Sequence, residues 1–98
     1  MQKYLFQFGY CTPAMWKGNE DHGWDDELSF AFFVSAETTH EALSWGCEVA
    51  ETFVARQFAE AGWKEIPSWK QSEFAYWIEE SPESVYPRSE LDKLPQVE

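Results

Sequence analysis

The segment that decides the fold is Thr38–Gly62, Thr-Thr-His-Glu-Ala-Leu-Ser-Trp-Gly-Cys-Glu-Val-Ala-Glu-Thr-Phe-Val-Ala-Arg-Gln-Phe-Ala-Glu-Ala-Gly. Thr38 and Glu41 have the capping-box spacing, in which a hydroxyl and a carboxylate satisfy two free amides at a helix N-terminus. Gly62 stands where a left-handed residue commonly ends a helix. The segment therefore predicts a helix of about six turns.

One face of this predicted helix is apolar. At about 100° per residue, a single stripe collects Leu43, Cys47, Ala50, Val54, Phe58 and Ala61, with Gly46 and Phe53 at its edge. The opposite face is polar, apart from Trp45. A helix with one apolar stripe has to cover another layer, so we expect the neighbouring strands to form a sheet beneath it.

Three segments have the alternating pattern of half-buried strands: residues 3–10, 28–36 and 73–79. Each places most of its large apolar side chains on one face, as expected where one face of a sheet is packed. The residues expected to face the core are Tyr4, Phe6, Phe8, Tyr10, Leu28, Phe30, Phe32, Val34, Ala36, Phe74, Tyr76 and Ile78.

The order strand, strand, helix, strand predicts an α+β two-layer sandwich of ββαβ topology, covered by the one long helix. We expect an antiparallel three-stranded sheet of order 2-1-3, because a helix of this length readily bridges the width of one strand. Direct pairing of the third strand with the second, through a right-handed crossover, is the alternative. Residues 63–66 are a possible short fourth edge strand, limited by Pro67.

A single α+β domain is expected over residues 1–81. Residues 82–98 are rich in Pro, Ser and Glu and form a C-terminal tail, with packing on the domain as one alternative. Phe33 and Trp77 belong to the second face of the predicted sheet. Either the long loop and the tail cover that face, or it is exposed and forms a homodimer contact.

The composition excludes some classes of partner. The net charge is −11, which disfavours DNA, RNA and anionic membranes, because phosphate binding needs clustered Lys and Arg. Six Trp, four Tyr and eight Phe argue against disorder. A basic protein partner is favoured, and the charge also promotes solubility.

The compartment expected from the sequence is the cytoplasm. The N-terminus leads directly into a strand pattern and has no apolar signal segment. No segment approaches the roughly 18 apolar residues of a membrane span. Cys11 and Cys47 are too few for a disulfide framework, and Cys47 is expected to be a buried small side chain.

A long connection is expected over residues 11–27, with turns at its glycines. A connection of this length in a small domain is either functional or mobile. It concentrates carboxylates and a histidine, Glu20, Asp21, His22, Asp25, Asp26 and Glu27. Their spacing matches neither the EF-hand loop nor a zinc motif, so an acidic interaction surface is favoured over a metal site.

Catalytic patterns are weak. His22 and His40 are the only histidines, and neither is placed by the sequence beside an activated nucleophile. The five glycines are scattered and form no phosphate-binding loop. We therefore expect neither an enzyme nor a cofactor.

The run Ala-Glu-Thr-Thr-His-Glu-Ala-Leu, residues 36–43, leads from a strand into the long helix. This corner resembles the strand-to-helix corner of HicB-type antitoxins, over about thirty residues. The glycine-containing motif usual before that strand is absent here, as is a DNA-binding segment. The resemblance concerns architecture, and no residue role is carried over.

The favoured hypothesis is a non-catalytic interaction module, of inhibitor, immunity-protein or antitoxin type, that binds a basic partner. Carboxylates would accelerate the encounter and tryptophans would anchor it. The expected contact residues are Trp16, Glu20, Asp21, Trp24, Asp25, Asp26, Glu27 and Trp45. The alternative is a small-ligand-binding protein with an aromatic pocket. An enzyme or metal-binding protein is the third hypothesis.

Overall fold

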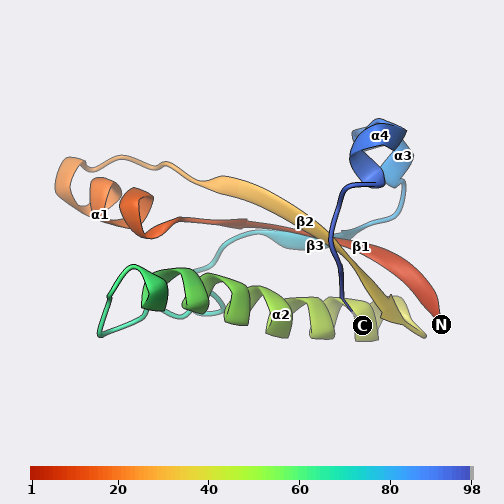
Figure 1. The fold of residues 1–98 in the computed structure, drawn as a ribbon, viewed down its shortest axis with the longest axis horizontal. Helices are drawn as coiled ribbons and strands as arrows, with labels where there is room; N and C mark the ends of the chain where they lie inside the picture. The colour runs from red at the N-terminus through yellow and green to blue at the C-terminus, as the bar shows by residue number, and fades with distance from the viewer. Residues whose placement is uncertain (98) are drawn as a thin grey trace.

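A computed structural model describes residues 1–97 of the chain. Its elements, in chain order, are β1 (Gln2–Tyr10), α1 (Pro13–His22), β2 (Leu28–Ala36), α2 (Thr39–Glu60), β3 (Tyr76–Glu79), α3 (Pro82–Val85), α4 (Arg88–Leu91) and β4 (Gln96–Val97). Figure 1 shows α2 along one face of the sheet, and α3 and α4 on the other side. The fold is thus α+β, with one long helix packed on a sheet, as the sequence predicts.

The sheet has the order β3-β1-β2-β4. β1 pairs antiparallel with both β2 and β3, so the predicted order 2-1-3 is confirmed for these three strands. The sheet has a fourth strand, β4, which pairs in parallel with residues 33 and 34 of β2. The proposed edge strand at residues 63–66 is wrong, since that segment contains no strand.

Both predicted ends of α2 are confirmed. Thr38 is the N-cap, and its hydroxyl accepts a hydrogen bond from the Glu41 N–H at 3.1 Å. The Glu41 carboxylate accepts from the N–H of Glu37 at 3.3 Å, one residue before the cap. Gly62, just beyond the helix, has φ +86°, a conformation that favours glycine.

The buried stripe of α2 is rotated from the predicted one. Its fully buried members are Ala42, Gly46, Ala50, Val54 and Phe58. Predicted stripe members on either side of it are only half-buried, and Ala61 is exposed at the helix end. Small residues occupy the centre because the helix backbone approaches the aromatic rings of β1 closely there.

A second contribution to the core comes from the segment after α2. Trp69 is 3% exposed, and its indole N–H donates to the Gly9 carbonyl at 2.8 Å. Its ring meets Phe8 edge to face, with centroids 5.5 Å apart. The carboxylate of Glu51 on α2 accepts from the hydroxyl of Ser68 and from the N–H of Lys70. These contacts hold the segment against both the sheet and the helix.

The predicted loop over residues 11–27 is partly wrong, because it contains α1. Thr12 is the N-cap of this helix, its hydroxyl accepting from the Met15 N–H at 3.2 Å, and Pro13 occupies the first turn. Proline is favourable there, since the first helical N–H groups have no helical partner. Gly23, with φ +68°, ends the helix.

The tail lies against the second face of the sheet. On that face, Gln7 is 5% exposed, and its side-chain oxygen accepts a 2.7 Å hydrogen bond from the Tyr86 hydroxyl. The Phe33 N–H donates to the Pro95 carbonyl at 2.8 Å. Phe33 is half-buried, whereas Trp77 is 42% exposed. Residue 98 of the predicted tail lies outside the described residues.

Candidate functional site

The acidic connection between α1 and β2 is fastened to α1 by one asparagine. The Asn19 amide nitrogen donates to the Asp26 carbonyl at 2.9 Å, and its amide oxygen accepts from the Asp26 N–H at 3.0 Å. The Cys11 thiol also donates to that carbonyl. Because these bonds use only the backbone of Asp26, its carboxylate remains available for other contacts.

This arrangement forms an acidic hollow of about 280 Å³ between the end of α1, the connection and the segment before β3. It is lined by Cys11, Trp16, Asn19, Glu20, Asp25, Asp26, Glu27 and Phe74. The ring of Trp16 packs edge to face on Phe58, with centroids 5.9 Å apart, and its N–H donates to the Glu20 carboxylate at 3.2 Å. An aromatic ring is thereby held beside a carboxylate.

The electrostatics of the acidic hollow favour a cation. The pKa of the Cys11 thiol is raised, first by burial and then by the negative charges of Glu27, Asp25 and Asp26. Carboxylates that oppose the formation of a thiolate would likewise oppose a bound anion. Within residues 1–97, no three His, Cys, Asp or Glu side chains come together in a group that could hold a metal ion.

The structure brings together five of the eight predicted contact residues in the acidic hollow, namely Trp16, Glu20, Asp25, Asp26 and Glu27. Trp24 folds back over α1, stacks on His22 with centroids 4.3 Å apart, and is 56% exposed. Asp21 is exposed on the last turn of α1 and does not line the hollow. Sequence reasoning missed Phe74 as a lining residue, because its contribution depends on how the chain returns to the sheet.

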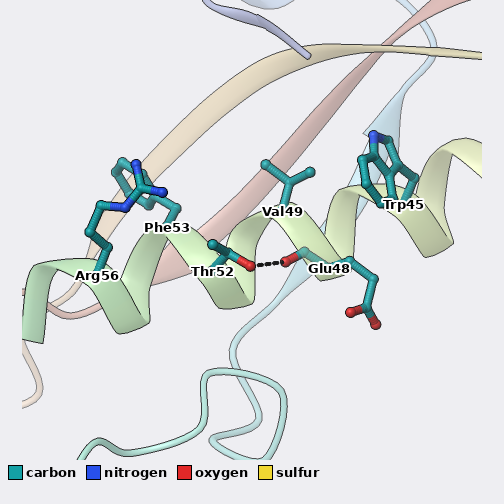
Figure 2. A pocket seen from close by; sticks show the side chains of 6 residues that line it. All are labelled: Trp45, Glu48, Val49, Thr52, Phe53 and Arg56. Carbon is teal, nitrogen blue, oxygen red and sulfur yellow. Dashed lines mark hydrogen bonds between the residues drawn. The ribbon is translucent and has the colours of Figure 1, made fainter. Parts of the chain in front are cut away.

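Trp45 lies elsewhere. It begins a groove of about 470 Å³ along α2, shown in Figure 2. The groove residues are Trp45, Glu48, Val49, Thr52, Phe53 and Arg56, with Trp45, Val49 and Phe53 on one side of the helix. Figure 1 places α1 by the C-terminal end of α2, whereas Trp45 is close to its N-terminal end.

The sequence pattern places Phe53 at the edge of the apolar stripe of α2, and the structure shows which residue this ring contacts. The Phe53 ring stacks on Phe30 of β2, with centroids 5.1 Å apart and an interplanar angle of 11°. It therefore forms part of the core and one wall of the groove along α2. The helical spacing of Trp45, Val49 and Phe53, with Arg56 after them, was the available signal for this groove.

No protein-family model, curated protein or solved structure matches this chain. In the part of the chain that the structure describes, no helix has the length and apolarity needed to cross a bilayer.

Proposed function

We propose that this protein is a non-catalytic interaction module that binds a basic protein through the acidic hollow. The observation that supports it is the convergence of Glu20, Asp25, Asp26 and Glu27 around the ring of Trp16. A Lys or Arg side chain of a partner would find carboxylate acceptors and an aromatic face in one place. The two free thiols suit the reducing cytoplasm, where we place the protein.

Electrostatics would govern how such a partner binds. The net charge of −11 attracts a basic protein over a distance of about one Debye length and accelerates encounter. Each cation–π contact contributes roughly 0.5–2 kcal/mol, depending on its exposure. Binding should therefore weaken as salt rises, and it should depend on these particular carboxylates.

The test uses a fluorescent oligoarginine peptide as probe, with affinity measured by anisotropy at low and at physiological salt. The double variant Asp25→Asn, Asp26→Asn removes two charges from the acidic hollow without changing side-chain size. We expect at least about a ten-fold loss of affinity, because two close charge contacts are removed.

The matched control is Glu90→Gln, Asp92→Asn, at exposed positions in and after α4. Figure 1 places α4 near the other end of the molecule from α1. This variant has the same net charge as the first, so general attraction is lowered equally. Equal loss in both variants, or no binding of the peptide to the native protein, would refute a basic-partner site in the acidic hollow.

The groove along α2 supports the second candidate function, a small-ligand-binding protein. Its volume of about 470 Å³ lies in the range of small-molecule sites, and Trp45, Val49 and Phe53 offer apolar contact. The Arg56 guanidinium would orient an anionic group on an aromatic ligand. Indole-3-acetate, titrated against the native protein and Trp45→Phe by calorimetry, tests it: the variant should bind more weakly, and absence of binding to the native protein would count against this class of ligand.

A further inference from the structure

The two edges of the sheet differ in how the chain covers them. At the β2 edge, the tail runs alongside: Pro95 accepts from the Phe33 N–H, and β4 pairs with residues 33 and 34. At the other edge, β3 has β1 as its only pairing partner in the described part of the chain. An uncovered edge strand is a template for pairing with another chain. β3 thus has no pairing partner on its outer side among the described residues, along all four of its residues, whereas β2 is paired on its outer side at residues 33 and 34.

The ladder between β1 and β3 shows which backbone groups face outward. The Gly9 N–H donates to the Ala75 carbonyl at 2.9 Å, which makes these two residues a hydrogen-bonded pair. Bonded and non-bonded pairs alternate in an antiparallel ladder, so Trp77 is bonded to β1 as well. Tyr76 and Ile78 consequently turn their N–H and C=O groups away from β1, toward the open edge.

A hollow of about 320 Å³ lies between this edge and the flank of α2. Tyr76 lines it from the sheet, and Leu43 and Cys47 line it from the helix, together with the polar residues His40, Ser44 and Glu48. Lys70, at its rim, is ion-paired with Glu48, so neither charge is free there. A strand added beside β3 would direct every second side chain toward α2, and this hollow would receive an apolar one.

The intervening side chains of an added strand would lie beside Trp77 on the other face. Trp77 is 42% exposed, and the carboxylates of Glu79 and Glu80 follow it along the chain, that of Glu79 already accepting from the Gln7 side-chain amide and the Ser81 N–H. Lys3 lines the adjoining hollow with these two carboxylates. Acidic and aromatic side chains in this order suit Lys or Arg on the incoming strand.

We propose that the open edge of β3 binds an extended segment of a partner, in which apolar and basic residues alternate, by β-strand addition. This inference rests on the proposed function, from which it takes the basic character of the partner. It adds that the partner's backbone pairs with β3. A second copy of this chain is a poorer occupant. Pairing two β3 edges would join two chains of charge −11, which repel each other.

The test uses short peptides of alternating valine and lysine, with binding measured by calorimetry. Strand pairing uses the N–H groups of alternate residues only. Peptides N-methylated on all valines or on all lysines have equal charge and composition, but one of them loses the bonding amides. We expect their affinities to differ by about ten-fold or more. Equal affinities would overturn docking at β3.

Amide hydrogen exchange adds a residue-specific readout. On binding, the exchange of the Tyr76 and Ile78 amides should slow, whereas that of Trp77, already bonded to β1, should not change. Unaltered exchange at Tyr76 and Ile78 with a saturating peptide would also overturn the proposal. Sedimentation of the native protein tests the self-pairing alternative. A dimer in which the Tyr76 and Ile78 amides are protected would show that a second copy of this chain, and not a partner segment, occupies the β3 edge.

A neutral peptide, with threonine in place of lysine, separates this inference from the proposed function. If the lysine peptide binds better and shows the N-methyl difference, both proposals are supported. If the neutral peptide binds as tightly as the lysine peptide, and its two N-methylated forms differ in affinity, strand addition at β3 is supported but the partner's basic character is refuted. A third outcome is that the two N-methylated lysine peptides bind with equal affinity, and that both bind more weakly to the Asp25→Asn, Asp26→Asn variant. This outcome would support the acidic hollow as the binding site and refute docking at β3.

Discussion

The ring of Phe6 lies directly against the backbone of Gly46, so that a Cβ atom added to Gly46 would stand 2.6 Å from Phe6 Cγ. Phe6 has no exposed surface, and Phe32 packs against it with centroids 5.2 Å apart. The ring therefore has little room to move aside. This contact sets how closely α2 approaches the sheet.

Gly46→Ala should destabilise the protein even though alanine is the better helix former. Alanine adds about 1 kcal/mol of helix propensity, but overpacking a filled core costs about 1–3 kcal/mol. We expect the free energy of unfolding, measured in urea, to fall by up to about 2 kcal/mol, the difference between these two contributions. Gly18→Ala in α1 is the control, since its Cβ would meet only Trp24, at 3.5 Å. Equal effects of the two variants would contradict the close contact with Phe6.

Trp69→Phe should destabilise the protein by roughly 1–3 kcal/mol, because it removes the donor to the Gly9 carbonyl in a buried position. The aromatic contact with Phe8 is largely kept. Trp24→Phe, at an exposed position, is the control and should change the free energy of unfolding by less than about 0.5 kcal/mol. Urea denaturation followed by circular dichroism measures both, and a negligible effect at Trp69 would show that this bond is not important for stability.

Tyr86→Phe should loosen the tail from the second face of the sheet. The variant leaves the buried side-chain oxygen of Gln7 without its 2.7 Å donor, which costs about 1–3 kcal/mol. We expect faster proteolysis after Arg88 and Lys93 by trypsin, because the opened tail is more accessible. Tyr4→Phe, whose hydroxyl bonds Gln2 at the exposed surface, is the control. Unchanged cleavage would indicate that Tyr86 does not fasten the tail.

The two thiols should react slowly with iodoacetamide near neutral pH. Burial raises the pKa of both Cys11 and Cys47, and the neighbouring carboxylates raise that of Cys11 further. Asp25→Asn, Asp26→Asn should therefore accelerate alkylation of Cys11 and leave Cys47 unchanged, as measured by mass spectrometry. An equal rate change at both thiols would indicate general loosening of the fold.

The same pKa shifts predict how stability depends on alkaline pH. The folded state disfavours both thiolates, so the unfolded state releases its thiol protons at lower pH than the folded state. Stability is unaffected below the ordinary thiol pKa of about 8.5 and falls as the pH rises through the raised values. Replacing both cysteines by alanine should flatten this decline in denaturation experiments. A decline that persists in the double variant would assign it to other groups.

The acidic hollow was only partly predictable from the sequence. The clustering of Glu20, Asp25, Asp26 and Glu27 was visible as a run of carboxylates. Their arrangement around Trp16 depends on α1, which the signal of Thr12 at the N-cap followed by proline could have revealed. The lining by Phe74 was not visible, because it comes from a segment more than forty residues further along the chain.

The sequence alone determined the α+β class, both ends of α2 and the order of the first three strands, because capping residues and side-chain periodicity act locally. Only the tertiary structure decided that Gly46 marks the centre of the helix–sheet contact, that Trp69 belongs to the core, and that β4 pairs with part of β2 while β3 has no second partner among residues 1–97. These features arise from packing and pairing between segments far apart in the chain, which local patterns do not encode.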